Sequence, residues 1–199
     1  MKRMIYSVLI LLPLQGMAQD SYKKEIEQYR RHYKEEFIAE ERSPLKGSDT
    51  AFIRFFPVNL IYRVNAHIEL VPDAPEFDME THSGKKQRYR NYAKATFTLQ
   101  GKSCTLFIYQ NVRIAAMPGK QNDLFLPFND LTNYATTYGG GRYLDLSIAD
   151  IKNSILTIDF NKAYNPYCAF REGYSCPIPP VENRLKIRVE AGEKSYGKP

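Results

Sequence analysis

The 199-residue sequence has no tryptophan, only three cysteines and only three histidines. So few cysteines exclude a small domain held together by many disulfides, and eleven glycines and twelve prolines exclude a collagen-like or low-complexity chain. The formal net charge of +6 is small and diffuse, which favours solubility over a nucleic-acid partner. Tyrosine and phenylalanine are abundant, with 15 and 11 residues, and this excess favours strands over helices.

The first 18 residues have the pattern of a secretory signal peptide. A basic start precedes an apolar stretch at 4–14, and Gly16 and Ala18 fit the small positions of a cleavage site, so we expect cleavage before Gln19. A membrane anchor is the alternative, but the run is short for a bilayer span. No later segment is apolar enough to cross a membrane. We therefore expect an exported bacterial protein, periplasmic or secreted.

One amphipathic helix is predicted at the start of the mature chain. From Asp20 to Glu41, apolar residues recur at steps of three and four, and most other positions are Lys, Glu or Arg. The apolar stripe consists of Tyr22, Ile26, Tyr29, Tyr33 and Phe37. Ser43-Pro44 should end the helix. We expect this segment, residues 19–45, to pack on the domain that follows.

From Ala51 onward the periodicity changes to two, which is typical of strands with one solvated face. Alternating segments lie at 62–70, 95–100 and 184–190, and segments apolar on both parities lie at 104–109, 124–128 and 155–160. With the turn signals between them, they predict about eight to ten short strands. The expected fold is therefore mainly β, a single antiparallel β-sandwich or barrel-like domain at 46–199 with an N-terminal amphipathic helix.

A glycine-rich stretch provides the first candidate site. Its candidate ligand-binding residues are Asp130, Thr132, Tyr138, Gly140, Gly141 and Arg142. Three consecutive glycines allow positive φ, and their free N–H groups beside Arg142 predict a cradle for a carboxylate or phosphate. The alternative is a glycine-rich hairpin in which Arg142 pairs with Asp130 or Asp145.

The segment after 155–160 provides the second candidate site. Strand alternation places Asp159 and Asn161 on one face, where Asp159 is a candidate acid, base or metal ligand if that face lines a cleft. Otherwise these two side chains hydrogen-bond loop backbone, which is their commoner use before a turn. Further candidates for the same cavity are Tyr164, Asn165 and Arg184.

Cys168 and Cys176 are close in sequence, and in an exported protein this spacing predicts a disulfide. Free thiols and a metal site are the alternatives, although a zinc site needs about four ligands. Cys104 lies in an apolar segment and should be a buried, inert thiol. No spacing links the three histidines as ligands, and no Gly-x-Ser-x-Gly elbow is present, so we expect neither a metal nor a cofactor.

The run at 85–94 combines basic and aromatic residues, as nucleic-acid surfaces do. Export argues against nucleic acid, so we expect a solvated hairpin there. An anionic glycan is the one partner worth testing on it.

Four segments carry a family resemblance. They are YGGGRYLD at 138–145, DFNKAYNPYCA at 159–169, CPIPPVENRL at 176–185 and, upstream, LFLPF at 124–128. In their order along the chain, together with shorter matches at 41–45, 55–58, 62–64 and 191–193, they resemble bacterial domain-of-unknown-function family sixteen-eighty-four over nearly the whole mature chain. The resemblance implies no activity. It does imply that similar chains without a leader carry the same Cys168 and Cys176 in a reducing compartment, where the pair would serve a site.

Three functions remain as hypotheses. The first is a non-catalytic domain, expected to be a monomer, whose cleft binds a small anionic or glycan ligand. The second is a hydrolase-type enzyme that uses Asp130, Asp145 or Asp159 as acid and base, with Arg142 stabilising negative charge. The third is a structural or interaction protein in which these motifs only fix turns.

Overall fold

The computed structural model describes residues 14–197, with side chains from residue 19 onward. The basic start and most of the apolar stretch of the predicted signal peptide lie outside this range. Within the described range, no helix is both long enough and apolar enough to span a bilayer.

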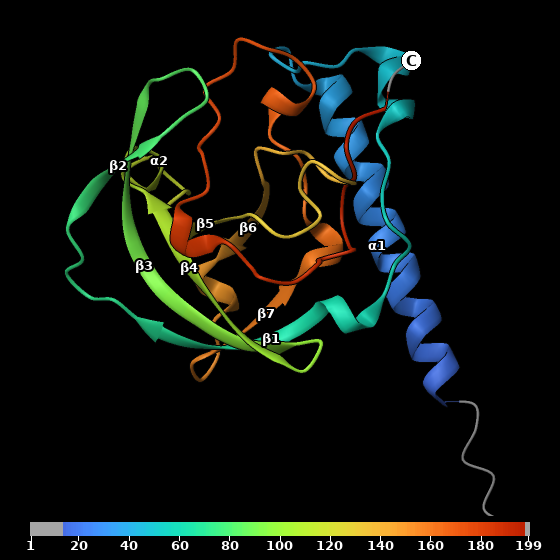
Figure 1. The fold of residues 1–199 in the computed structure, drawn as a ribbon, viewed down its shortest axis with the longest axis horizontal. Coiled ribbons are helices and arrows are strands. Elements are labelled where there is room, and N and C mark those ends of the chain that lie inside the picture. Colours follow the sequence, from blue (N-terminus) through green and yellow to red (C-terminus); the bar gives the residue numbers. More distant parts are fainter. Residues whose placement is uncertain (1–13, 198–199) are drawn as a thin grey trace, which may run out of the picture.

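A single curled antiparallel sheet of seven strands forms the body of the molecule (Figure 1). The strands are β1 (Arg63–Leu70), β2 (Glu76–Glu80), β3 (Lys86–Leu99), β4 (Lys102–Asn111), β5 (Asp123–Phe128), β6 (Arg142–Ser147) and β7 (Ile155–Asp159). Their order across the sheet is β6-β5-β4-β3-β1-β7, and β2 pairs with β3 beside this path. The sheet closes into half of a barrel, which confirms the mainly β, barrel-like form of the prediction.

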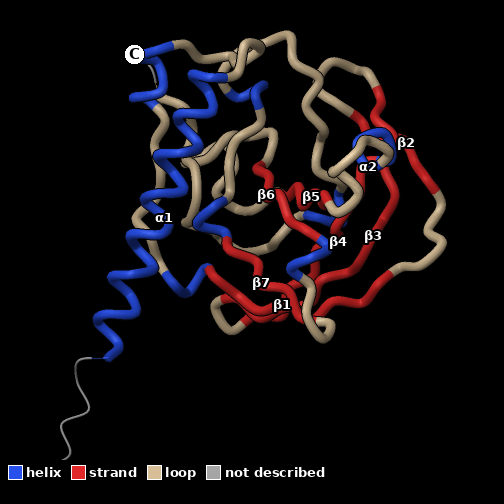
Figure 2. The backbone as a smooth tube through the Cα atoms, turned by 180° about the vertical axis from the view of Figure 1, so that it is seen from behind, coloured by secondary structure: helices blue, strands red, loops and turns tan. Residues whose placement is uncertain are grey.

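Apart from α1 (Leu14–Ala39), the helices in the described part of the chain are short. The second α-helix, α2 (Val112–Ala115), follows β4. Six short 3-10 helices lie at Gly47–Phe52, Leu60–Tyr62, Ile148–Asp150, Phe160–Lys162, Tyr167–Ala169 and Val181–Asn183. Figure 2 shows, from behind, how the strands wrap around tan loop segments, with α1 along one side.

The long strand β3 explains much of the curl. Its first half pairs with β2 and its second half pairs with β1, while β4 pairs with it from Tyr89 to Leu99. The register between β3 and β4 shifts between Asn91 and Ala93. A β-bulge of this kind bends a strand and increases its local twist. The bend lets two different partners occupy one side of β3.

The predicted strand at 184–190 is wrong, because no strand forms there. Leu185, Ile187 and Val189 are buried in the main core, as the alternation predicts. However, this segment (red in Figure 1) crosses the inside of the curled sheet, and its backbone bonds to loops instead of a strand. The Leu185 N–H, for example, donates to the Asn129 carbonyl at 2.8 Å. An alternation of apolar and polar residues shows only that one side of an extended segment is buried. A strand and an extended segment inside a half-barrel both meet this condition.

The N-terminal helix α1 forms as predicted, and its apolar stripe faces the domain. It packs along the half-barrel against the short helices Gly47–Phe52 and Phe160–Lys162 (Figure 1). Its buried or half-buried stripe residues are Tyr22, Ile26, Tyr29, Tyr33 and Phe37. The helix ends at Ala39, before the predicted stop at Ser43-Pro44.

A buried hydrogen-bond cluster joins α1 to the end of β7. The Tyr22 hydroxyl donates to the Asp159 carboxylate at 2.9 Å and accepts from Asn161 Nδ2 at 2.9 Å. Asp159 also caps the short helix Phe160–Lys162, since its Oδ1 accepts from the Asn161 N–H at 3.0 Å. Two candidate site residues therefore hold the helix and a turn in place.

We predict that Tyr22→Phe lowers the free energy of unfolding by about 1.5–3 kcal/mol, because it removes a hydrogen bond to a buried carboxylate. Chemical denaturation measures the change. Tyr134→Phe is the matched control, since Tyr134 is 90% exposed and its loss of a hydroxyl should change stability by less than about 0.5 kcal/mol. Equal stability of the two variants would show that the Tyr22–Asp159 contact does not anchor α1.

Candidate functional site

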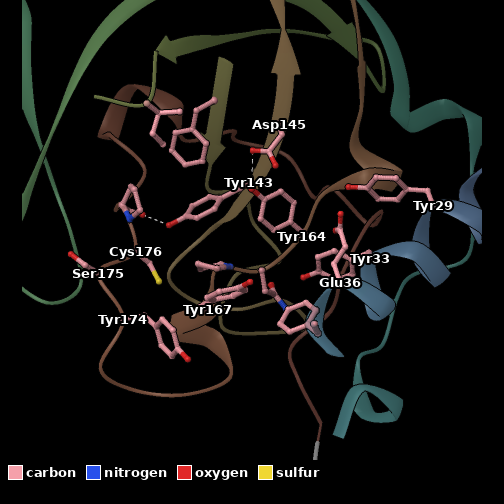
Figure 3. A pocket seen from close by; sticks show the side chains of 16 residues that line it. Tyr29, Tyr33, Glu36, Tyr143, Asp145, Tyr164, Tyr167, Tyr174, Ser175 and Cys176 are labelled. Atoms are coloured by element: carbon pink, nitrogen blue, oxygen red, sulfur yellow. Dashed lines mark hydrogen bonds between the residues drawn. The ribbon is translucent and has the colours of Figure 1, made fainter. Parts of the chain in front are cut away.

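A cavity of about 500 Å³, which we call the aromatic pocket, opens between α1, β6 and the loop around 164–177 (Figure 3). Eight of its sixteen lining residues are aromatic: Tyr29, Tyr33, Phe37, Phe125, Tyr143, Tyr164, Tyr167 and Tyr174. No lysine, arginine or histidine is among the sixteen lining residues. Ligand pockets of comparable size combine apolar and aromatic walls with a few polar groups.

Strand β6 supplies one wall through its two-residue periodicity. Tyr143 and Asp145 lie on the face that lines the pocket, whereas Arg142 and Leu144 lie on the buried face. Tyr164 is fixed opposite Tyr143, because their backbone groups exchange hydrogen bonds at 2.9 and 3.0 Å. The two rings meet edge to face, with centroids 5.8 Å apart.

Helix α1 supplies the opposite wall. Tyr29, Tyr33 and Phe37 follow one another at four-residue spacing and therefore share one face of the helix. Glu36 lies on the same wall, with its side chain 63% exposed at the rim. The apolar stripe of α1, which was predicted to pack on the domain, therefore contributes both to the core and to the pocket wall.

The tyrosine hydroxyls of the pocket are mostly bonded to the protein itself. Two hydroxyls donate to carboxylates: Tyr164 to Asp145 and Tyr33 to Glu193. Three donate to backbone carbonyls: Tyr29 to Lys162, Tyr174 to Arg42 and Tyr143 to Pro177. Burial raises the pKa values of the Tyr33 and Tyr164 hydroxyls well above the usual value for tyrosine, so both hydroxyls stay neutral. The rings are therefore held in place, and it is their faces and edges that line the cavity.

Apart from the Tyr167 hydroxyl, the polar groups that remain in the pocket are acceptors. Asp145 is open to the cavity yet crowded by its walls, and this desolvation raises the pKa of its carboxyl group, assisted by the negative charges of Asp123 and Glu36. Asn165 is buried, and its Oδ1 accepts no hydrogen bond from any described residue, while its Nδ2 donates to the Lys194 carbonyl at 2.8 Å. A ligand in this cavity meets groups that require a donor.

The predicted disulfide between Cys168 and Cys176 is confirmed, and Cys104 is buried and free as expected. The bridge closes the loop that carries Tyr174 and Ser175, which line the aromatic pocket (Figure 3). Tyr174 packs edge to face on Tyr167, with ring centroids 5.3 Å apart. The bond therefore fixes the part of the wall that no strand or long helix supports.

We predict that the double variant Cys168→Ala/Cys176→Ala loses about 2.5 kcal/mol of stability, the loop-closure entropy of so short a ring. Thermal or urea unfolding measures the loss. Adding a reductant to the native protein should reproduce it, and adding the reductant to the double variant should change nothing. A reductant effect of equal size on the double variant would contradict this prediction.

The predicted anion cradle at Arg142 is closed in the structure. The Arg142 side chain is 0% exposed and its Nη2 contacts Asp130 Oδ2 at 2.7 Å. It also donates to the Thr132 hydroxyl at 3.5 Å and to the carbonyls of Val189, Ala191 and Glu193. Arg142 thus satisfies the backbone of the C-terminal segment that crosses the half-barrel, and the alternative pairing with Asp130 is the one observed.

The glycine run is explained by close packing. A Cβ on Gly139 would meet the Tyr134 ring at 2.2 Å, and one on Gly140 would meet the Tyr138 ring at 2.4 Å. Gly141 has a φ of +91° and lies against the Phe128 carbonyl. These residues accommodate neighbouring rings and a turn before β6.

The candidate residues do not meet in one cavity. Tyr164 and Asn165 line the aromatic pocket, whereas Asp130, Gly140 and Arg184 line a separate cavity beside His82. Asp159 lines a third cavity, which shares Asp145 with the aromatic pocket. Thr132 and Asn161 are fully buried. Of the three carboxylates in the hydrolase hypothesis, Asp145 and Asp159 line one cavity, whereas Asp130 lines another and Arg142 is fully buried, so Asp130 and Arg142 do not join the other two.

The basic run at 85–94 belongs to β3, and acidic residues of β2 neutralise part of it. Arg88 contacts Glu76 and Asp78 at 3.2 and 3.1 Å, and Lys86 contacts Glu80 at 3.5 Å. Among the described residues, no cluster of His, Cys, Asp and Glu could hold a metal ion.

Sequence reasoning missed most of the aromatic pocket. Glu36, Phe125, Tyr143, Tyr167 and Tyr174 were not among the candidate residues, although they line it. Two features of the sequence could have indicated this pocket: the many tyrosines between positions 138 and 174, and the tyrosines of the helix stripe. Only the fold shows that these two groups face each other.

Comparison with known proteins adds a family and a related structure. A family model described as "Protein of unknown function (DUF1684)" matches residues 50–194. The chain is similar to an uncharacterized protein of Haloarcula marismortui whose solution NMR structure is known. The two sequences are 30% identical, and the structures superpose with a TM-score of 0.67 over 89% of this chain and 96% of that one. No curated protein matches.

Proposed function

Because this chain belongs to the DUF1684 family, whose description names no activity, we propose its function from the geometry of the aromatic pocket. The protein is an exported domain that binds a small organic ligand in this cavity. The observation that carries the proposal is the set of ring faces held rigid around about 500 Å³ of space by hydroxyls bonded to the protein. A preorganised wall of this kind binds a ligand without first having to order its side chains.

The polar groups that line the pocket favour some classes of ligand over others. Both carboxylates of the pocket, on Glu36 and Asp145, and the unpartnered Asn165 Oδ1 favour a ligand that donates hydrogen bonds. An anionic ligand, one of the two classes expected from the sequence, would have to approach these carboxylates without a basic residue in the lining. A glycan, the other class, carries hydroxyl donors and remains compatible with the pocket.

Export is supported by the leader-like segment 1–18 and by the disulfide, which persists in oxidising compartments. Cleavage before Gln19 would also leave the docking of α1 intact, since Tyr22 and Ile26 lie after that point. We expect intact-mass measurement of the protein from a periplasmic or culture fraction to give a chain beginning at Gln19. Recovery of the uncleaved chain in the cytoplasm would contradict export.

A tryptophan reporter tests ligand binding, since the chain has no tryptophan of its own. Ile114→Trp places the reporter at the pocket rim, where Ile114 is 41% exposed, and Ile61→Trp is the matched control at a 55% exposed isoleucine outside the pocket lining. The probes are N-acetylglucosamine, choline and glucuronate. We expect a saturable emission change with N-acetylglucosamine or choline in the Ile114→Trp variant only. No response to any probe, or the same response from both reporters, would contradict the proposal.

A further inference from the structure

We propose that the aromatic pocket selects an organic cation, a protonated amine or a quaternary ammonium group; this inference rests on the function proposed above. Cations of this type bind over the faces of aromatic rings, and cages of several rings are the usual way in which proteins recognise quaternary ammonium groups. The aromatic pocket presents rings from three directions, namely α1, β6 and the disulfide-closed loop (Figure 3).

The protein's own cations show which rings are already occupied. Arg30 lies 4.5 Å from the centroid of Phe55 and Lys194 lies 4.9 Å from that of Phe56, both outside the pocket lining. Within the lining, Lys162 lies 5.6 Å from the centroid of Tyr29, on the side of the neighbouring cavity that Lys162 lines. No described lysine or arginine takes such a position over any other ring of the pocket. Apart from Tyr29, the rings of the pocket are therefore not occupied by a cation of the described chain.

The charges of the pocket have the complementary sign. Asp145 lines the aromatic pocket and both neighbouring cavities, so its carboxylate lies where the three spaces meet. Glu36 adds a second carboxylate, whose contact with His32 Nε2 at 3.4 Å lies on the helix itself. The lysines that line the two neighbouring cavities are each paired with another carboxylate, Lys162 with Glu25 at 2.9 Å and Lys120 with Asp123 at 3.1 Å. The net field inside the cavity is therefore set by carboxylates.

A buried acceptor lies beside the same space. Asn165 is 1% exposed and belongs to the pocket lining, and its Oδ1 has no donor among the described residues. A buried oxygen without a partner costs about 1–3 kcal/mol, and a hydroxyl or N–H group of a ligand that reached it would remove that cost. The aromatic rings and the carboxylates are therefore the features that match an ammonium ligand better than a neutral or anionic one.

Titration calorimetry of the mature protein tests the selectivity with choline and its neutral isostere, in which a tert-butyl group replaces trimethylammonium. The two probes have the same shape, so their difference reports the charge alone. We expect choline to bind about tenfold more tightly or better, as one cation–π contact plus a partly desolvated carboxylate would give. Asp145→Asn, which keeps an acceptor for the Tyr164 hydroxyl, should remove most of this preference and leave binding of the isostere unchanged.

Asp73→Asn is the charge-matched control, because Asp73 is an exposed turn residue outside the aromatic pocket and asparagine tolerates its φ of +56°. It should preserve the preference for choline. Equal affinity for the two probes in the native protein would overturn the cation inference. If N-acetylglucosamine then binds in the same assay, the proposed function stands with a different ligand class. If none of the probes binds, the proposed function fails as well.

Discussion

Replacing Arg142 by methionine should lower the free energy of unfolding by about 3–5 kcal/mol, the cost of leaving one member of a buried ion pair without its partner. Asp130 would lose its contact at 2.7 Å while remaining inside the protein. The carbonyls of Val189, Ala191 and Glu193 would lose a shared donor at the same time. We expect the loss to appear as an earlier midpoint in urea unfolding.

The control for this prediction is Arg113→Met, because Arg113 is exposed on α2 and methionine suits a helix. Its stability should change by less than about 0.5 kcal/mol. If the native protein bound glucuronate and a stable Arg142→Met protein did not, the internal role of Arg142 would be contradicted. That outcome would restore the anion cradle expected from the glycine run.

The second large effect concerns pH. Burial raises the pKa of Glu193 from 4.5 to about 7, although hydrogen bonds from the Asn165 N–H and the Tyr33 hydroxyl, both at 2.9 Å, partly oppose the shift. Because the folded state holds this proton more tightly than the unfolded state, stability falls as pH rises from about 4.5 through 7. The full shift corresponds to about 3 kcal/mol. Unfolding measured at intervals between pH 5 and pH 8 should show the decline.

Glu193→Gln isolates this contribution. The amide mimics the protonated acid and keeps an acceptor for Tyr33 and Asn165, so the variant should lose most of the decline and equal or exceed the native protein at pH 8. Glu172→Gln, at an exposed loop position, should retain the native pH profile. If Glu193→Gln shows the same decline as the native protein, another group is responsible for it.

Local patterns in the sequence were sufficient for the elements whose neighbours along the chain determine their burial. The stripe of α1 and the strand β1 follow from periodicity, whereas β4, β5 and β7 follow from short segments that are apolar on both parities. The segment at 184–190 shows the limit of this reasoning. Its alternation reflects burial inside the half-barrel, and its hydrogen bonds go to residues distant in sequence, including Arg142 and Asp130.

The candidate site illustrates the same limit at the level of single side chains. Arg142 beside three glycines is compatible with an anion site or an internal ion pair, and only the path of the C-terminal segment distinguishes them. Tyr33 was predicted to be a core residue, yet its ring lies 5.9 Å from that of Tyr164, across 131 positions of sequence, at the pocket wall. Pairs so distant in sequence leave no periodic signal. The disulfide was predictable because its two cysteines close a short loop.

Chemical-shift mapping with choline tests the central claim most directly. In a titration of the isotopically labelled protein, we expect the largest amide shifts at Tyr164, Asn165, Tyr167 and residues 174–176, which line the aromatic pocket. The shifts should saturate and should weaken in Asp145→Asn. Largest shifts around Arg184 and His82, in the separate cavity, would contradict the assignment of the site, as would the absence of any saturable shift with choline and N-acetylglucosamine alike.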